Sequence, residues 1–520
     1  MGNEISSDFQ YTNFYNSCLF TGKVRKYIIR VGQVVSRLLV KNNNLLSTGC
    51  LYGYLLIISY AQNFKFYVIL VFISVCKESG LKYIQVVLLM LVGFSTLAEE
   101  RSGVDISIVK SGDNFWKLIY QMDRPASRIG FVRNPDASRV ERWEPLSLEF
   151  EIVSIDGYEY LARKDGASFD RVEISLTPTY KHLKKDYAPF SPYSNGGNLI
   201  YTGRLFACIE ACSDDVQSWK LSMQIPEGEH MIVNGQVYTG STNWVDRESG
   251  MNIYVGTQKP IEGSSFIAVI DGGLPDKIRN SLNSDIPKMI NYFGGRLGEN
   301  TVGKPTLYAS YAQVDGSDRQ GGTLPNQIFM HWNLNDMDKR LEDPSFVSDI
   351  IWFFAHEVAH FHQEGKEEVL SNDVSESWLH EGNADWLAAS ALIDLYPDLE
   401  EYVYSKIDKY KVSCSEGLKE FPLVEAANHG RFDLYYSCGL LIHRAIDQSL
   451  QEKSNGSLNL FSLWKSYRET IEGGGEKGSD SFLNMVEDRT SRDFVEVIRQ
   501  LINSKLVNPE ATLDKLSETI

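Results

Sequence analysis

The sequence is short of basic residues. It has 51 Lys and Arg against 68 Asp and Glu in 520 residues, which gives a formal net charge of −17. Binding to nucleic acid depends on clustered positive charge, so this balance excludes nucleic acid as a partner. Long internal repeats and low-complexity tracts are also absent, and 43% of the residues are hydrophobic. Disordered, collagen-like and coiled-coil chains are therefore excluded, and the length predicts two or three globular domains.

Positive charge is nevertheless concentrated at the start of the chain. Residues 1–98 hold nine Lys and Arg against three Asp and Glu, a balance of +6, so residues 99–520 carry −23. Lys82 is followed by an apolar run that ends at Ala98, the pattern of a secretory signal. We predict a signal peptide or membrane anchor at residues 81–98, with cleavage after Ala98 if it is a signal. The protein is then exported, to the periplasm or the extracellular space.

A signal peptide should begin a protein, and the sequence has no methionine between Met1 and Met90. We therefore interpret residues 1–80 as an upstream extension that results from a wrongly assigned translation start. The alternative is a genuine membrane anchor formed by Leu51–Cys76, with or without residues 83–98. That stretch is long enough to cross a bilayer, although Lys65 lies in its middle, where a charge is costly.

Cysteine is scarce, with seven residues in the whole chain. Three of them lie before residue 81, which leaves an even number in the predicted mature protein. An exported protein can pair these four as disulfides, whereas free buried thiols are the alternative, and the sequence leaves the pairing open. The four are Cys208, Cys212, Cys414 and Cys438.

Residues 99–262 are predicted to form a β-rich N-terminal domain, a sandwich or saddle. Short runs with period-two alternation, such as 146–152, 172–176 and 219–225, predict half-buried strands. Asp156-Gly157 and Asn234-Gly235 lie between such runs and are typical of tight hairpin turns. No combination of residues typical of catalysis is found in this region.

The chemistry is concentrated in a segment that follows Asp343-Pro344, a pair typical of a helix start. His356 and His360 are four residues apart, so on a helix their imidazoles lie one turn apart on one face and can bind the same zinc ion. Glu357 lies beside the first histidine and can act as a general base toward a water at the metal.

A second apolar helix is predicted from Ser377 to Leu387. Its Glu381 follows His360 by 21 positions and can supply the third protein ligand of the zinc. Asp385 lies one turn further on. It can accept a hydrogen bond from a zinc-binding imidazole and fix its tautomer.

His356-Glu357-x-x-His360, followed by Trp378-Leu379-His380-Glu381-Gly382, resembles the gluzincin metallopeptidases, and most of all their membrane-alanyl-aminopeptidase and glycyl-aminopeptidase branches. The resemblance implies zinc bound by His356, His360 and Glu381, with Glu357 as general base. A further segment also resembles the family, since Tyr435-Tyr436-Ser437-Cys438-Gly439 is similar to its Tyr-x-Lys-Gly motif. This resemblance implies that Tyr436 stabilises the oxyanion.

The resemblance also implies the fold. We expect an α+β multidomain protein in which the β-rich domain precedes a thermolysin-like, mostly helical zinc-peptidase domain with a small edge-strand sheet. That gluzincin domain is placed at residues 263–450, and residues 451–520 are predicted to form a C-terminal helical segment. Other histidines are expected to be structural or to lie at the surface, including His362 on the surface of the zinc-binding helix.

The sequence departs from the family pattern in four places. The spacing from His360 to Glu381 is about two residues longer than in the alanyl-aminopeptidase branch, which implies a longer loop. His380 and Cys438 replace the asparagine and lysine of the two motifs, and the glutamate that reads a substrate's free amine is missing. The corresponding segment, from Gly321-Gly322 to Met330, retains the glycines and an extended apolar end. We predict that it binds a peptide backbone as an edge strand, and we leave the choice between exopeptidase and endopeptidase open.

These observations predict an exported metallopeptidase with one zinc ion per chain. Its expected partner is a peptide or protein substrate, with a membrane contacted only through an N-terminal anchor. Two alternatives remain open. One is a non-catalytic envelope binding or assembly protein that retains the metallopeptidase scaffold, and the other is a zinc hydrolase that acts on something other than peptides.

Overall fold

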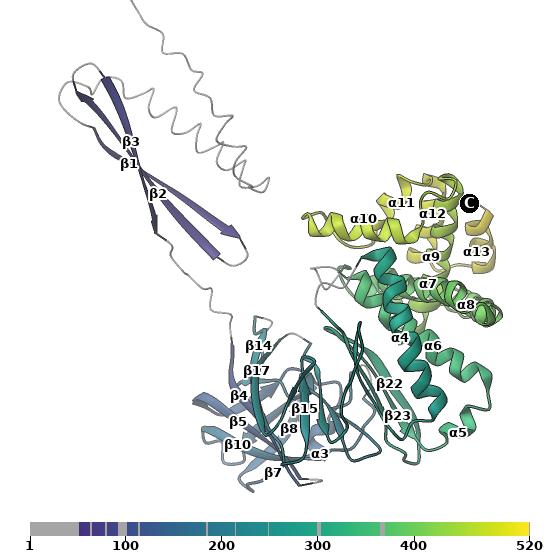
Figure 1. Ribbon diagram of the computed structural model, residues 1–520, viewed down its shortest axis with the longest axis horizontal. Helices are drawn as coiled ribbons and strands as arrows, with labels where there is room; N and C mark the ends of the chain where they lie inside the picture. The colour runs from purple at the N-terminus through teal and green to yellow at the C-terminus, as the bar shows by residue number, and fades with distance from the viewer. Residues whose placement is uncertain are drawn as a thin grey trace, which may run out of the picture. The chain divides into compact units, whose positions relative to one another are not determined.

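The structure is a computed structural model in which the chain forms two compact units, Met1–Glu100 and Arg101–Ile520 (Figure 1). Most of the predicted extension and the predicted cleavage site at Ala98 lie outside the described residues. The described residues are 51–62, 65–78, 81–91, 101–112, 115–183, 186–213, 215–247, 249–298, 303–364 and 370–518.

The described part of the first unit is a three-stranded antiparallel sheet with β2 in the centre. The described residues of the apolar stretches proposed as a signal or an anchor belong to these strands. Within the described residues, the structure contains no helix with the length and apolar character that a bilayer crossing needs. The signal peptide and the anchor both stay predictions. The strands are β1 (Leu51–Gln62), β2 (Lys65–Glu78) and β3 (Leu81–Leu91).

Residues 101–256 form the predicted β-rich region as three sheets. The first has the order β17-β14-β4-β5-β10-β7, the second β13-β6-β9-β8 and the third β11-β12-β18-β15-β16. The first contains β4 (Arg101–Ser111), β5 (Phe115–Ala126), β7 (Trp143–Pro145), β10 (Phe169–Leu176), β14 (Ser218–Gln224) and β17 (Ser241–Arg247). The second contains β6 (Arg128–Phe131), β8 (Phe150–Ile155), β9 (Tyr158–Arg163) and β13 (Ala207–Ile209). The third contains β11 (Phe190–Pro192), β12 (Asn198–Tyr201), β15 (His230–Val233), β16 (Gln236–Tyr238) and β18 (Asn252–Gly256).

Both predicted tight turns connect antiparallel neighbours. Asp156-Gly157 joins β8 to β9 with φ of 52° and 83°, and Asn234-Gly235 joins β15 to β16 with φ of 51° and 70°. Positive φ at both positions is what a type I′ hairpin requires, and Asn, Asp and Gly tolerate it. The predicted strand at 146–152 begins only at Phe150, because the preceding residues form a turn in which Leu148 is 89% exposed.

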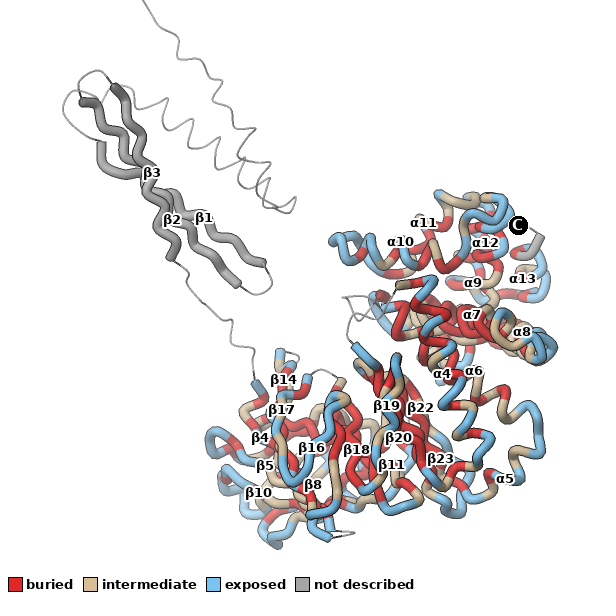
Figure 2. The backbone as a smooth tube through the Cα atoms, viewed as in Figure 1, coloured by how far each residue is buried: buried red, intermediate tan, exposed pale blue. Residues whose placement is uncertain are grey.

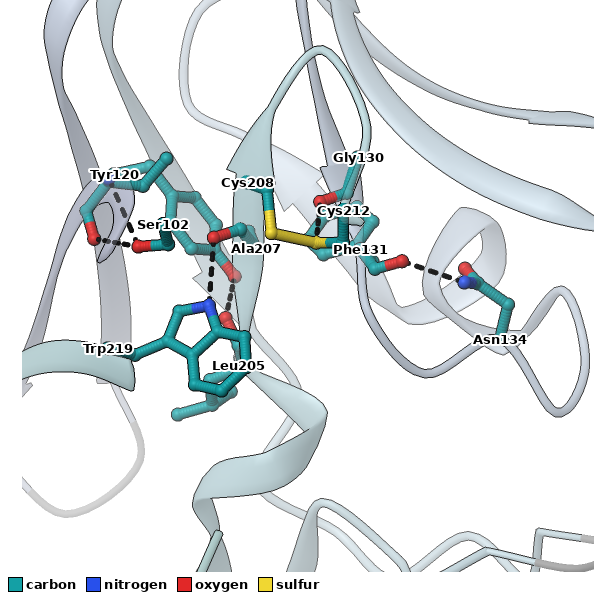
Figure 3. Close-up of a disulfide and its surroundings, with 11 residues drawn as sticks. Ser102, Tyr120, Gly130, Phe131, Asn134, Leu205, Ala207, Cys208, Cys212 and Trp219 are labelled. Atoms are coloured by element: carbon teal, nitrogen blue, oxygen red, sulfur yellow. Dashed lines mark hydrogen bonds between the residues drawn. A yellow bond between two sulfur atoms is a disulfide. The ribbon is translucent and has the colours of Figure 1, made fainter. Parts of the chain in front are cut away.

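A disulfide joins Cys208 in β13 to Cys212 in the β-rich region (Figure 3). Beside it, the indole of Trp219 donates to the carbonyl of Ala207 at 3.1 Å, and the hydroxyl of Tyr120 donates to the carbonyl of Leu205 at 2.8 Å. Each of these hydrogen bonds satisfies a buried polar group of a large aromatic side chain. The short strand β13 is therefore held to its surroundings on both sides.

The sheet that positions the site has the order β19-β20-β21-β23-β22. β20, β21 and β23 are parallel neighbours, whereas β22 pairs antiparallel with β23 and is an edge strand. Because β19 pairs with β20, the sheet begins at Ile261, just before the predicted boundary at residues 262/263. Its strands are β19 (Ile261–Glu262), β20 (Ile267–Ile270), β21 (Thr306–Tyr311), β22 (Ser317–Leu324) and β23 (Gln327–Leu334).

Helices make up most of the chain after β23, and together with α4 they share one buried core with the sheet, shown red in Figure 2. The predicted C-terminal segment 451–520 belongs to this core through side chains such as Trp464 and Phe482. The helices are α3 (Ser138–Arg142), α4 (Asp276–Leu297), α5 (Met337–Arg340), α6 (Pro344–Gln363), α7 (Trp378–Leu395), α8 (Glu400–Leu418), α9 (Asp433–Lys453), α10 (Leu460–Glu472), α11 (Ser479–Glu487), α12 (Arg492–Asn503) and α13 (Pro509–Glu518).

Buried polar contacts join the β-rich region to this sheet. The amide of Gln327 in β23 accepts from the backbone N–H of Asn252 at 2.8 Å and donates to its carbonyl at 3.0 Å. Asp271, which follows β20, accepts the backbone N–H of Ser194 at 2.8 Å and that of Tyr311 at 2.9 Å. Such satisfied buried contacts fix the relative position of the two parts.

Candidate active site

The His356-Glu357-x-x-His360 motif lies on α6, a 20-residue helix. It begins as the sequence predicts, because the Asp343 carboxylate accepts the backbone N–H of Ser345 at 2.9 Å and Pro344 occupies the first turn. His356 and Glu357 are buried, and His360 is half-buried. The helix thus presents all three side chains on the side that faces α7 and β22.

The structure brings His356, His360 and Glu381 together. The Nε2 atom of His356 lies 2.9 Å from Nε2 of His360 and 3.1 Å from Oε2 of Glu381. Nε2 of His360 lies 3.3 Å from the same Glu381 oxygen, so the three atoms form a ligand triangle. A tetrahedral zinc ion with bonds of about 2.1 Å separates its ligand atoms by about 3.4 Å. Two imidazole nitrogens and one carboxylate oxygen are also a donor set that zinc prefers, so these residues fit a zinc ion.

Both imidazoles have an acceptor at Nδ1. Oδ1 of Asp385 lies 2.9 Å from Nδ1 of His356, and Oε1 of Gln363 lies 2.7 Å from Nδ1 of His360. These acceptors place the proton on Nδ1 and leave the lone pair on Nε2 free for a metal. The indole of Trp352 donates to the same Asp385 oxygen at 2.9 Å, which holds the carboxylate in place.

Gln363 was not identified from the sequence. Its amide nitrogen donates to the carbonyl of His380 at 3.0 Å and to the side chain of Asn383 at 2.6 Å, so its oxygen is the atom that faces His360. The signal in the sequence is its place three residues after His360, on the same helix face.

Glu381 reaches the ligand triangle because α7 and α9 cross with their backbones in contact. A methyl group on Gly382 would lie 2.3 Å from Cα of Gly439, and one on Gly439 would lie 2.7 Å from Cα of Gly382. Non-bonded carbon atoms do not approach one another so closely, so both positions require glycine. These two glycines belong to the motifs of Glu381 and Tyr436, and their contact brings the motifs to one place.

Glu357 points toward the edge strand, where its Oε2 accepts the hydroxyl proton of Thr323. Burial raises the pKa of Glu357, although His356, His360 and the Thr323 hydrogen bond act against it. A carboxylate with a raised pKa is a stronger base, which suits proton transfer near neutral pH. Thr323 is the second functional residue that the sequence did not reveal, because its contact depends on how β22 packs on α6.

Tyr436 is half-buried and its ring centroid lies 5.5 Å from that of His356. Burial raises its pKa well above the usual value, and the carboxylates of Glu381 and Glu357 raise it further, so the phenol stays protonated and can donate. The neighbouring Tyr435 is instead in the core, where its hydroxyl accepts the backbone N–H of Ala427 at 3.2 Å.

Gly321 and Gly322 lie on β22, at the edge of the sheet, as predicted. The predicted edge strand up to Met330 is wrong in its second half, because the chain turns after Leu324 and Met330 lies on the interior strand β23. A methyl group on Gly321 would lie 2.5 Å from Cζ of Phe353, and one on Gly322 would lie 2.3 Å from Oη of Tyr187. The glycines therefore allow α6 and the β-rich region to approach the strand from its two faces.

A cleft of about 460 Å³ opens beside the ligands. His356, Glu357, Asp385 and Tyr436 line one part of it, and Gly321 of the edge strand lines another. A peptide in this cleft can therefore contact the edge strand and the predicted catalytic residues at the same time. The remaining lining residues are Arg319, Asp349, Trp352, Phe353, Lys406 and Tyr410.

The expectation that His362 lies on the helix surface is wrong. It is buried, and its Nδ1 lies 2.9 Å from the carbonyl of Gly298, because the end of α4 packs over this turn of α6. His331 and His443 are also buried, and burial lowers their pKa values to about 3 and about 4. Both stay neutral at physiological pH and have structural roles.

No protein-family model matches the sequence, and no curated protein matches it. Solved structures do. An aminopeptidase N family protein from Idiomarina loihiensis has a TM-score of 0.58 at 12% identity, over 79% of this chain and 78% of that chain. An M1 zinc metallopeptidase from Deinococcus radiodurans has a TM-score of 0.44 at 14% identity, over 78% of this chain and 93% of that chain. Native yeast LTA4 hydrolase has a TM-score of 0.47 at 13% identity, over 80% of this chain and 71% of that chain.

Of these likenesses, the one to the Idiomarina loihiensis protein defines the class of the scaffold. The chain has a gluzincin-like fold, in which a β-rich N-terminal region precedes a helical region with a His-His-Glu triad. At this level of identity the likeness concerns the fold and does not distinguish between the aminopeptidase branches.

Proposed function

We propose that this protein is a zinc-dependent metallopeptidase that hydrolyses peptide bonds. The single observation that carries the proposal is the ligand triangle of His356, His360 and Glu381, with Glu357 next to it on the wall of the same cleft. A zinc ion bound there supplies a Lewis acid that polarises the scissile carbonyl and lowers the pKa of a water molecule.

The protein residues position the substrate and move protons. The peptide lies antiparallel to β22, beside Gly321 and Gly322, and pairs with the backbone of this edge strand. Glu357 takes a proton from the attacking water and delivers it to the leaving amine. Tyr436, which stays protonated, donates a hydrogen bond to the developing oxyanion.

Replacing Glu357 with Gln tests the proposal. This change keeps the shape of the side chain and the zinc ligands but removes the base, so we expect bound zinc to stay stoichiometric and kcat/KM on a peptide library to fall at least about a hundredfold. Glu342→Gln is a matched control, because Glu342 is exposed and precedes α6. The proposal fails if the wild-type protein binds no stoichiometric zinc or if the Glu357→Gln variant cleaves as fast as wild type.

We also propose where the protein works and with what. The sequence left the cysteine pairing open, and the structure bonds Cys208 with Cys212 and Cys414 with Cys438. Disulfides persist in oxidising compartments, which supports export to the periplasm or the extracellular space. The proposed partner is a peptide or protein substrate, and any membrane contact is through the N-terminal segments.

A further inference from the structure

The cleft beside the zinc ligands contains two cationic side chains that the proposed reaction does not use. Arg319 comes from β22 and Lys406 from α8, and both line the cleft together with Glu357 and Tyr436. Arg319 also lines a smaller adjoining hollow of about 190 Å³. Since residues 99–520 carry a formal charge of −23, two cations in the cleft are unexpected for this chain.

Arg319 is exposed, and among the residues that the structure describes its side chain forms no hydrogen bond or ion pair. Lys406 is more confined. Its Nζ lies 4.8 Å from the ring centroid of Trp352 and 3.4 Å from Oδ1 of Asp349, which also accepts the hydroxyl of Tyr402 at 2.6 Å. Asp349 therefore pairs with Lys406, whereas Arg319 forms no ion pair among the described residues, although Asp349 lines the same two hollows.

The position of Arg319 along the strand sets where it meets a substrate. Alternate residues of a strand share a face, so Arg319, Gly321 and Thr323 lie on the face of β22 from which Thr323 reaches Glu357. Four residues of strand span about 13 Å. A peptide antiparallel to β22 runs from its N-terminal part near Thr323 to its C-terminal part near Arg319.

We infer that Arg319, assisted by Lys406, binds a substrate carboxylate within about four residues on the C-terminal side of the scissile bond. The inference rests on the proposed peptidase function and adds the substrate class. A guanidinium matches a carboxylate with two parallel hydrogen bonds, which makes it a suitable group for this recognition. The carboxylate is either the C-terminus of a short peptide or the side chain of an acidic residue in a longer one.

Two pairs of internally quenched peptides distinguish these sources. In the first pair the peptide ends within about four residues after the scissile bond, as a free acid or as an amide. In the second pair the chain continues and carries Glu or Gln at that position. We expect the wild-type protein to prefer the charged member of one pair by roughly tenfold in kcat/KM, the size of a charge-assisted hydrogen bond.

The Arg319→Gln variant should lose most of that preference, because its kcat/KM on the charged member falls toward its kcat/KM on the neutral member. Arg319→Glu should reverse the preference in favour of a Lys-containing peptide. Lys411→Gln is the matched control. It removes a cation from the same helix as Lys406, but Lys411 pairs with Asp514 at 2.7 Å and does not line the cleft.

A binding measurement separates recognition from chemistry. In the Glu357→Gln background the peptides are held but not cut, and we expect the ratio of dissociation constants to follow the same preference and the same dependence on Arg319. Equal treatment of charged and neutral peptides, or a preference that survives Arg319→Gln, overturns this inference and leaves the peptidase proposal intact. If zinc-loaded wild-type protein cleaves none of the peptides, both proposals fail.

Discussion

At the residue scale, the proposed zinc site depends on side chains that are not themselves proposed as ligands. Asp385 and Gln363 each accept from the Nδ1 of one zinc-binding imidazole. The acceptor decides which nitrogen of the ring carries the proton, so it also decides whether the metal-facing nitrogen has a free lone pair. The acceptor for His360 thus comes from its own helix, α6, and the acceptor for His356 comes from the next long helix, α7.

Gln363→Leu should weaken zinc binding by roughly tenfold to a hundredfold although Gln363 is not a ligand. Leu keeps the approximate size of the side chain but cannot accept the Nδ1 proton of His360. Competition with a chromophoric chelator measures the affinity. Gln448→Leu on α9 is a control that removes an amide remote from the ligands. An unchanged affinity in Gln363→Leu would show that the contact does not orient His360.

Zinc binding should also weaken as the pH falls. Burial disfavours the charged form of His356, but Asp385 and Glu381 more than compensate and raise its pKa well above 6.5 in the metal-free protein, and Glu381 likewise helps to raise that of His360. Protons then compete with zinc for Nε2, and the apparent affinity should decline below the raised pKa, starting above pH 6.5.

The pH dependence is measured as zinc affinity against pH. Asp385→Asn removes the carboxylate that raises the pKa of His356, so its curve should move to lower pH. If the wild-type affinity is constant down to pH 6.5, the carboxylates do not hold the proton on His356 as we describe.

At the scale of elements, the crossing of α7 and α9 is the feature on which the site depends. Gly382 and Gly439 let the two backbones touch, which sets Glu381 of one helix and Tyr436 of the other beside the histidines of α6. The disulfide between Cys414 and Cys438 joins α8 to α9 at the residue that directly precedes Gly439.

Gly439→Ala should destabilise the protein by about 1–3 kcal/mol, because the added methyl group forces the two helices apart in a packed region. It should also reduce zinc affinity, since Glu381 moves with α7. Urea unfolding and zinc titration measure the two effects.

Gly295→Ala is the control for this prediction. Gly295 lies in α4, and nothing is within 4 Å of an added methyl group there, so alanine should stabilise the helix by about 0.5–1 kcal/mol. Equal stability of Gly439→Ala and wild type would mean that the helices can separate without cost.

At the scale of the whole molecule, the described residues after position 100 form one compact unit, which includes the β-rich region, the zinc site and the C-terminal helices. The residues before it form a separate unit. The boundary between the two units, after Glu100, lies close to residue 98, where the sequence changes from a positive to a negative net charge.

If residues 81–98 are a signal peptide, N-terminal sequencing of the exported protein should start at Glu99. A protein that comprises residues 99–520 should then have the zinc stoichiometry and the thermal unfolding midpoint of the full chain within error, because the second unit has its own cores. A mature protein that still starts at Met1, or a shortened chain that does not fold, would contradict this.

The sequence by itself determined the local features of the protein. His356 and His360 at helical spacing, a helix start at Asp343-Pro344, and hairpins at Asp156-Gly157 and Asn234-Gly235 each follow from interactions between residues a few positions apart. The resemblance in the two motifs added Glu381 and Tyr436, and the structure brings both beside the histidines.

Only the tertiary structure decided the features that depend on residues distant in sequence. The contact of Thr323 with Glu357, the burial of His362 under α4, and the placing of Arg319 and Lys406 in one cleft all join elements that local patterns cannot relate. The physical reason is that periodicity and spacing specify which face of an element is buried, whereas packing specifies which element buries it.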